Sequence, residues 1–360
     1  MKKVKLAIVG VGNCASSLVQ GLEYYKTAPE ASAGLMHADI AGYTLDSVEI
    51  VATFDVDARK VGKSVEEAIF APPNNTTVFC KEISASGVTV QMGPVLDGVA
   101  EHMDEFPDAQ AFRKADAEPV DVTQVLKDTG AEVMVCYLPV GSESAARHYA
   151  QCCIDAKVAM VNCLPVFIAS HPEWAEKFEK AGVPIVGDDI KSQVGATIIH
   201  RALARLVSAR GARLDHTYQL NTGGNTAFLN MLKEERLKTK RISKTESVQS
   251  QLDDRLDAFD IHIGPSDYVA WQKDNKVCFL RMEWRGWGDV PMHVEARLSV
   301  EDSPNSAGVA IDGIRLAKLA LDRGLGGPVE GASAYLMKHP PRQMRDSEAR
   351  ELIDAFIAGS

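Results

Sequence analysis

The sequence predicts an α/β fold, a doubly wound parallel sheet that carries an inserted α+β unit. Residues 1 to about 200 alternate short apolar runs with helical patterns, as a parallel sheet with crossover helices requires. Residues 201–301 instead contain longer runs that alternate apolar and polar residues, which is typical of strands with one covered face. Helical periodicity returns from residue 302. We therefore expect residues 1–200 and 302–360 to share one domain, with 201–301 inserted for catalysis and oligomerisation.

The first predicted strand, residues 5–9, runs directly into a glycine-rich turn and a helix over residues 16–25. The turn reads G-x-G-x-x-A and consists of Gly10, Val11, Gly12, Asn13, Cys14 and Ala15. Gly10 permits a tight turn, Gly12 lets the backbone approach a pyrophosphate, and Ala15 keeps the helix close to the strand. The helix N-terminus, where Asn13 lies, presents free N–H groups to phosphates. The alternative is an ordinary strand-to-helix turn.

An acidic residue at the end of the second strand supports the dinucleotide interpretation. Residues 48–54 form an apolar run that ends at Asp55. A carboxylate there accepts hydrogen bonds from a ribose 2′-hydroxyl and repels a 2′-phosphate, so the pattern predicts NAD rather than NADP. The spacing from the turn is longer than usual, and we interpret residues 26–46 as an insertion. The first domain is thus predicted to be a Rossmann-like NAD-binding domain.

The composition excludes several classes of function. The net charge is −10 and no basic run appears, which argues against a nucleic-acid partner. No apolar run is long enough to span a membrane, and no signal peptide is expected, because an apolar strand pattern begins within the first residues. The seven cysteines show no CxxC spacing, as in reduced thiols of a cytoplasmic protein. The nine histidines show no ligand spacing, so the sequence carries no metal signature.

The remaining elements place four lysines in informative surroundings. Helices are expected over 120–129, 143–156, 227–237 and 302–322, and strands over 131–137, 158–162, 183–187, 214–220, 277–284 and 291–300. Lys240 and Lys244 share one face of a helix, although a solvated basic surface has the same spacing. Lys276 precedes a strand, where a hairpin-tip charge is the alternative, and Lys338 follows an apolar run. Lysines of this kind bind phosphate, transfer protons or stabilise an enolate.

Acidic residues stand where the ligand crevice of such a sheet is expected. Asp188 and Asp189 follow the 183–187 strand, and Asp302 and Ser303 begin a helix. Loops after the carboxyl ends of parallel strands line the crevice. Helix capping explains both pairs equally well, because Asp and Ser are common at helix starts.

These stretches together resemble the myo-inositol-1-phosphate (inositol-3-phosphate) synthases, in particular their actinobacterial branch. The motifs are AIVGVGNCASSLVQGLEYY, FDVDARKVG, YLPVGSE, VPIVGDDIKSQVGATI, LNTGGNTAFLNML, RISKTESV, HIGPSDYVAW, EDSPNSAGVAIDGIRLAKLALDRG and SAYLMK. The resemblance implies an isomerase with tightly held NAD that converts D-glucose 6-phosphate to 1D-myo-inositol 3-phosphate. In that reaction C5 is oxidised, C6 loses a proton, C6 attacks the C1 aldehyde, and C5 is reduced again. The product begins inositol and inositol-phospholipid biosynthesis.

The resemblance also implies roles for particular residues. Lys240, Lys244, Lys276, Lys338 and Asp189 match catalytic positions, and Asn225 matches an asparagine that lines the substrate. The matched cofactor positions are Gly10, Gly12, Asn13, Ala15, Asp55, Tyr149, Asp188, Ser192, Asp302 and Ser303. A homotetramer is implied, and some relatives use a cation whose identity the residues do not reveal. Many relatives have aspartate two residues after Asn225, where this chain has Ala227.

Two other functions compete with the cyclase. A plain NAD-dependent dehydrogenase acting on a phosphorylated sugar needs one acid/base group, so it leaves four lysines unexplained. An NAD-sensing regulator would carry a DNA-binding or partner-binding module, and the acidic chain shows no such signal.

Overall fold

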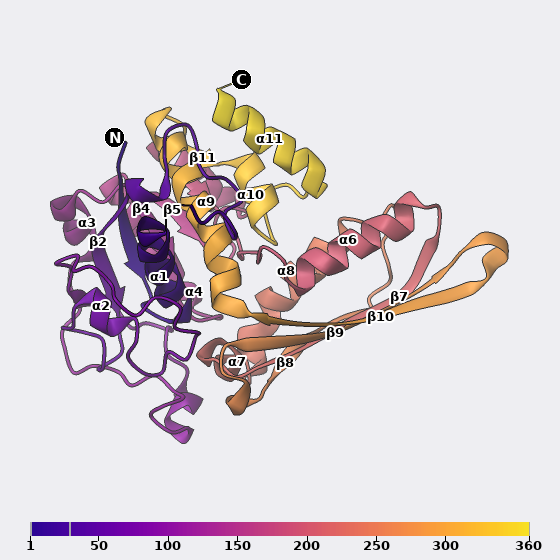
Figure 1. Cartoon of the computed structure of the whole chain (residues 1–360), viewed down its shortest axis with the longest axis horizontal. Coiled ribbons are helices and arrows are strands. Elements are labelled where there is room, and N and C mark those ends of the chain that lie inside the picture. The colour runs from indigo at the N-terminus through magenta and orange to yellow at the C-terminus, as the bar shows by residue number, and fades with distance from the viewer. Residues whose placement is uncertain (1, 29, 360) are drawn as a thin grey trace.

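A computed structural model describes residues 2–28 and 30–359, apart from the side chains of residues 265 and 266. Its larger sheet is parallel and has the strand order β11-β6-β5-β4-β1-β2-β3 (Figure 1). The strands are β1 (Val4–Val9), β2 (Val48–Asp55), β3 (Val90–Met92), β4 (Val133–Cys136), β5 (Ala159–Asn162), β6 (Pro184–Val186) and β11 (Gly327–Pro328). The predicted fold class is confirmed.

Helices cover both faces of this sheet because its strands are apolar on both sides. On β1, Leu6 and Ile8 face one core while Ala7 and Val9 face the other. The first core is closed by helices α1 (Asn13–Thr27), α2 (Val65–Ala68), α9 (Asp302–Asp322), α10 (Glu330–Leu336) and α11 (Asp346–Ala358). The second is closed by α3 (Val122–Thr129), α4 (Glu143–Ala156) and α5 (Pro172–Ala181). Chain segments before and after the second sheet therefore share one core.

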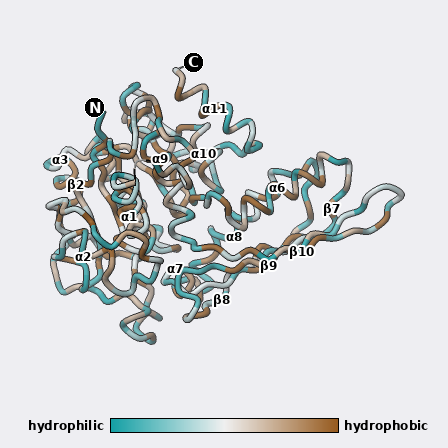
Figure 2. The backbone as a smooth tube through the Cα atoms, in the orientation of Figure 1, coloured by the Kyte–Doolittle hydropathy of each residue, from teal (hydrophilic) through white to brown (hydrophobic). Residues whose placement is uncertain are grey.

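The second sheet has the order β10-β9-β7-β8, and its long β9–β10 hairpin extends away from the first sheet (Figure 1). It comprises β7 (Arg213–Gly223), β8 (Ile261–Tyr268), β9 (Asn275–Arg285) and β10 (Pro291–Glu301). Figure 2 shows hydrophilic and hydrophobic residues following one another along β9 and β10. Helices α6 (Ala196–Ala209) and α8 (Lys238–Gln249) pack on one face, where Met282 and Leu280 lie in the core.

Two local predictions differ from the structure. The single helix expected over 227–237 is divided into α7 (Thr226–Asn230) and a 3₁₀ turn (Glu234–Leu237) that leads into α8. The Asn230 amide donates to the Val140 carbonyl, and the Arg236 guanidinium donates to the same carbonyl. These tertiary bonds hold the segment against the β4–α4 loop and override its helical periodicity. Strand β8 was not predicted, and helix α6 starts at Ala196, inside the stretch assigned to the first domain.

Candidate active site

The glycine turn adopts a conformation that requires glycine. Gly10 has φ +86°, and a Cβ there would lie 2.9 Å from the Tyr137 carbonyl oxygen. Gly12 precedes α1, whose N-terminus has no side-chain cap, and the space where its Cβ would lie is open. The Asp55 carboxylate closes the turn by accepting the Val11 N–H at 2.6 Å. The turn therefore leaves helix N–H groups accessible beside a carboxylate.

A cavity of about 200 Å³ opens at this turn, at the carboxyl ends of the parallel strands. Twelve of the predicted site residues line it: Gly10, Gly12, Asn13, Asp55, Tyr149, Ser192, Asn225, Lys240, Lys276, Asp302, Ser303 and Lys338. The remaining predicted residues, Ala15, Asp188, Asp189 and Lys244, lie behind this lining and are buried. The structure thus brings the glycine turn and three of the four lysines to one cavity.

Asp189 organises two of those lysines. Its Oδ1 accepts the Lys240 ammonium at 2.6 Å and the Lys338 ammonium at 3.1 Å, and its Oδ2 accepts the Ser243 hydroxyl at 2.6 Å. Burial alone would raise the pKa of the Asp189 carboxyl, but the two ammonium charges hold it below its usual range. Asp189 therefore remains a carboxylate that aligns Lys240 and Lys338.

The other two lysines have opposite electrostatic environments. Burial, together with the charges of Lys276 and Lys240, lowers the pKa of Lys244 well below its ordinary value. Burial would also lower the pKa of Lys276, but the Asp302 carboxylate, 3.0 Å from its ammonium, raises it. Lys338 lies between these extremes, because burial lowers its pKa to about 8 and Asp189 partly offsets the effect. Groups whose pKa values are separated in this way can serve as acid, base and fixed cation in one site.

Asp188 has a different environment from its neighbour. Its carboxylate is buried and accepts hydrogen bonds from the Asn162 amide, the Ser170 hydroxyl and the backbone N–H groups of residues 168–170. Burial raises its pKa to about 6. The structure shows Asp188 holding the 166–170 loop rather than lining the cavity.

Sequence reasoning missed two residues that border the site. Asp274, in the turn before β9, is buried and contacts Asn13, Asn225 and Ser303. Burial and the nearby Asp302 raise its pKa to about 6. Tyr137 lines the cavity, and its buried hydroxyl has no hydrogen-bond partner in the part of the chain that the structure describes. Asp274 stands two residues before Lys276, and this closeness to a candidate lysine is the sequence signal that could have identified it.

The residues around the turn fit a dinucleotide. Open helix N–H groups suit a pyrophosphate, and the Asp55 carboxylate suits ribose hydroxyls. Apolar side chains of Phe54, Val56 and Pro94 border the same cavity, as a flat base requires. Among residues 2–28 and 30–359 no cluster of His, Cys, Asp and Glu could hold a metal ion. No helix in the same residues is long and apolar enough to cross a membrane.

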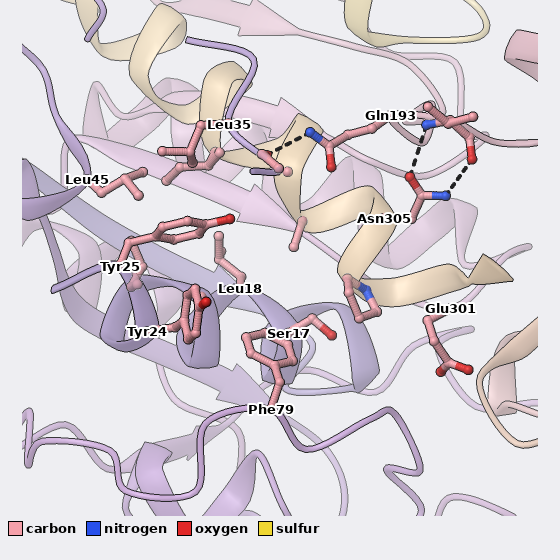
Figure 3. Close-up of a pocket in the computed structure, with 18 of the residues that line it drawn as sticks. Ser17, Leu18, Tyr24, Tyr25, Leu35, Leu45, Phe79, Gln193, Glu301 and Asn305 are labelled. Carbon is pink, nitrogen blue, oxygen red and sulfur yellow. Dashed lines mark hydrogen bonds between the residues drawn. The ribbon is translucent and has the colours of Figure 1, made fainter. Parts of the chain in front are cut away.

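A larger cavity of about 530 Å³ lies between α1 and α9. Figure 3 shows Tyr25, Leu18 and Phe79 among its lining side chains. At one side the Gln193 amide donates to the Gly34 carbonyl and the Asn305 amide donates to the Val194 carbonyl. Its lining is largely apolar and includes none of the predicted site residues. The predicted lysines therefore lie at or behind the smaller cavity and not at this one.

The fold and the cavity define a Rossmann-type α/β protein whose glycine turn opens on a cluster of buried and half-buried lysines. A family model described as myo-inositol-1-phosphate synthase matches residues 195–303. The inositol-3-phosphate synthase of Mycolicibacterium smegmatis is 56% identical over 363 residues, which cover 99% of this chain and 98% of that protein. The enzyme of that name from Corynebacterium glutamicum is 52% identical over 361 residues, 98% of each chain. The chain belongs to the inositol-3-phosphate synthase family.

Solved structures share the fold of this chain. The crystal structure of Ari2 superposes with a TM-score of 0.79 at 36% identity and covers 99% of both chains. A myo-inositol-1-phosphate synthase-related protein from Thermotoga maritima has a TM-score of 0.82 at 22% identity, covers 99% of this chain and 98% of its own, and shares the fold.

Proposed function

We propose that the protein converts D-glucose 6-phosphate to 1D-myo-inositol 3-phosphate. The observation that carries the proposal is the group of four lysines and Asp189 beside the glycine-turn cavity, in a chain that belongs to this enzyme family. A plain dehydrogenase needs one acid/base group beside the cofactor and leaves the other lysines without a task.

NAD is the proposed cofactor, held by the glycine turn, the α1 N-terminus and Asp55, with Tyr149, Ser192, Asp302 and Ser303 at its border. When bound, NAD supplies a hydride acceptor for C5 of the sugar and returns the hydride after ring closure. The Asp55 carboxylate favours the 2′-hydroxyl of NAD over the 2′-phosphate of NADP.

The lysines divide the remaining tasks according to their environments. The pKa values of Lys244 and Lys338 are lowered, so either side chain can be present as a neutral amine. A neutral amine at either position can take the C6 proton. Lys276 remains an ammonium because of Asp302, and it stabilises the negative charge that develops on the C5 oxygen. Lys240, ion-paired with Asp189, is available to the phosphate or to the C1 oxygen as C6 attacks. Asn225 borders the same cavity and is proposed to line the substrate.

Assembly and location extend the proposal. Leu220 and Phe279 are opposite one another on the open face of the second sheet, and both are exposed. A second copy that covers this face would bury them, which supports the proposed homotetramer. All seven cysteines are free thiols, which supports a reducing cytoplasm. A cation requirement is proposed from the family resemblance alone, with no ion identified.

Product analysis tests the function directly. Purified protein is incubated with glucose 6-phosphate and substoichiometric NAD, and products are identified by ³¹P and ¹H NMR. We expect inositol phosphate in excess of the NAD present and no accumulation of NADH at 340 nm. Stoichiometric NADH with an open-chain product would instead establish the dehydrogenase alternative.

A further inference from the structure

Asp274 connects four segments that meet at the active site. Its carboxylate is 1% exposed and accepts five hydrogen bonds. Oδ1 accepts the amides of Asn225 at 2.8 Å and Asn13 at 3.2 Å and the Ser303 hydroxyl at 3.0 Å. Oδ2 accepts the Thr76 hydroxyl at 2.7 Å and the Ser303 N–H at 3.1 Å. Every partner donates, so the group acts as a carboxylate with both oxygens in use.

One side of this connection reaches the glycine turn. Asn13 is the first residue of α1, and its side-chain oxygen accepts the N–H groups of Asn75 and Thr76 at 2.8 and 3.2 Å. Its amide donates to Asp274 and to Asn75. The start of the proposed cofactor-binding helix is therefore held to Asp274 both directly and through Thr76.

The other side reaches the 221–228 loop and the lysine cluster. The Asn225 side-chain oxygen caps α7 by accepting the N–H groups of Ala227 and Phe228, while its amide donates to Asp274. The Asp274 carbonyl accepts the Asp302 N–H at 3.1 Å, and the Asp302 carboxylate pairs with Lys276. Ala227 has no carboxylate, and Asp274 supplies one to this loop from the turn before β9.

We propose that Asp274 is a positioning residue that couples the cofactor side of the cavity to the substrate side. The amides of Asn13 and Asn225 both donate to its Oδ1 oxygen. When one of these amides is held in place, it holds the Oδ1 oxygen in place, and that oxygen in turn orients the other amide. A dinucleotide that orders the α1 N-terminus thereby orders the substrate loop, and a sugar phosphate that orders the loop favours the dinucleotide in return. The identities of the two ligands rest on the proposed function.

The test measures coupling without turnover. Calorimetric dissociation constants are determined for NAD alone, for 5-deoxyglucitol 6-phosphate alone, and for each ligand in the presence of the other. 5-Deoxyglucitol 6-phosphate is an open-chain probe that lacks both the C5 hydroxyl and the aldehyde, so it can be neither oxidised at C5 nor cyclised. In the wild type we expect each ligand to tighten the other at least fivefold, by the same factor in both directions.

Asp274→Asn retains the shape of the side chain but replaces one carboxylate oxygen by an NH₂ group. That group cannot accept the hydrogen bonds that the partners on its side donate. We expect the coupling factor to fall to about 1, with each single-ligand dissociation constant within about threefold of the wild type. Asn225→Ser still offers a helix cap but is too short to reach Asp274, so it should lose coupling with an intact fold. Thr76→Val removes a hydroxyl donor from Oδ2 but leaves the bonds from Asn13 and Asn225 to Oδ1 in place. It is therefore the matched control and is expected to retain coupling.

Three results would overturn the inference: wild-type coupling near 1, undiminished coupling in a folded Asp274→Asn, or undiminished coupling in Asn225→Ser. If Asp274→Asn does not fold, Asn225→Ser decides. Failure of the proposed function has a separate sign, since wild-type protein would then bind both ligands poorly and form no inositol phosphate.

Discussion

Replacement of Lys244 by methionine separates catalysis from stability. The Lys244 side chain is 94% buried from solvent, since the residue is only 6% exposed, and three other lysines act on its charge. Methionine has a similar length and no charge, so it can occupy the same space. The change therefore removes a proton-transfer group without opening a large cavity.

The expected loss of activity follows from the role of that amine. A positioned acid or base contributes about 10²–10⁴-fold to a rate, which corresponds to about 3–5 kcal/mol of transition-state stabilisation. We expect kcat/KM of Lys244→Met to fall by that factor while the dissociation constant for NAD stays within about threefold. Inositol phosphate formation and calorimetric NAD binding provide the two measurements.

The stability of the same variant should not fall. The folded state lowers the pKa of Lys244, so below the unfolded pKa of about 10.4 the unfolded chain binds more protons at this residue. This term makes the wild type less stable as pH decreases, and methionine removes it. At pH 7 the variant should melt at the same temperature as the wild type or higher.

Lys238→Met is the matched control, because Lys238 is an exposed lysine on the same helix. It should leave activity and melting unchanged. Near-normal turnover by Lys244→Met would refute the proposed catalytic role. A clear drop in its melting temperature would refute the expectation that the buried charge lowers stability.

Three further predictions follow from other parts of the site. Asp55→Ala should weaken NAD binding about tenfold or more by calorimetry, and unchanged affinity would remove Asp55 from the ribose-binding role. With the neutral amine of Lys338 as the base, wild-type kcat/KM should rise with pH through a midpoint near 8, and a flat profile would contradict that role. Lys338→Ala should retain NAD binding and lose cyclisation. Arg201→Met should destabilise the fold by about 1–3 kcal/mol in urea unfolding, because methionine cannot replace the hydrogen bonds that the buried guanidinium donates to the Ser247 and Met344 carbonyls and to Asp346; an unchanged free energy of unfolding would show that the cluster adds little.

Local elements of the first domain were predictable because their signals are local. The helix expected over 143–156 coincides with α4, and the expected 302–322 helix coincides with α9. The glycine turn was also predictable, since φ +86° at Gly10 and the close approach of the Tyr137 carbonyl depend on backbone geometry that only glycine tolerates. Periodicity failed over 227–237, where hydrogen bonds to the distant Val140 divide the predicted helix.

The sequence by itself determined the class of fold and predicted the dinucleotide turn, because apolar periodicity and turn chemistry act over a few residues. The four lysines were assigned catalytic roles only through the family resemblance. The tertiary structure decided which charges are desolvated and which are paired. Asp188 and Asp189 are neighbours in the chain, yet one holds a loop and the other aligns two lysines. These environments depend on burial and on contacts with residues more than fifty positions away in the chain. Neither can be predicted from the residues next to Asp188 and Asp189 in the sequence.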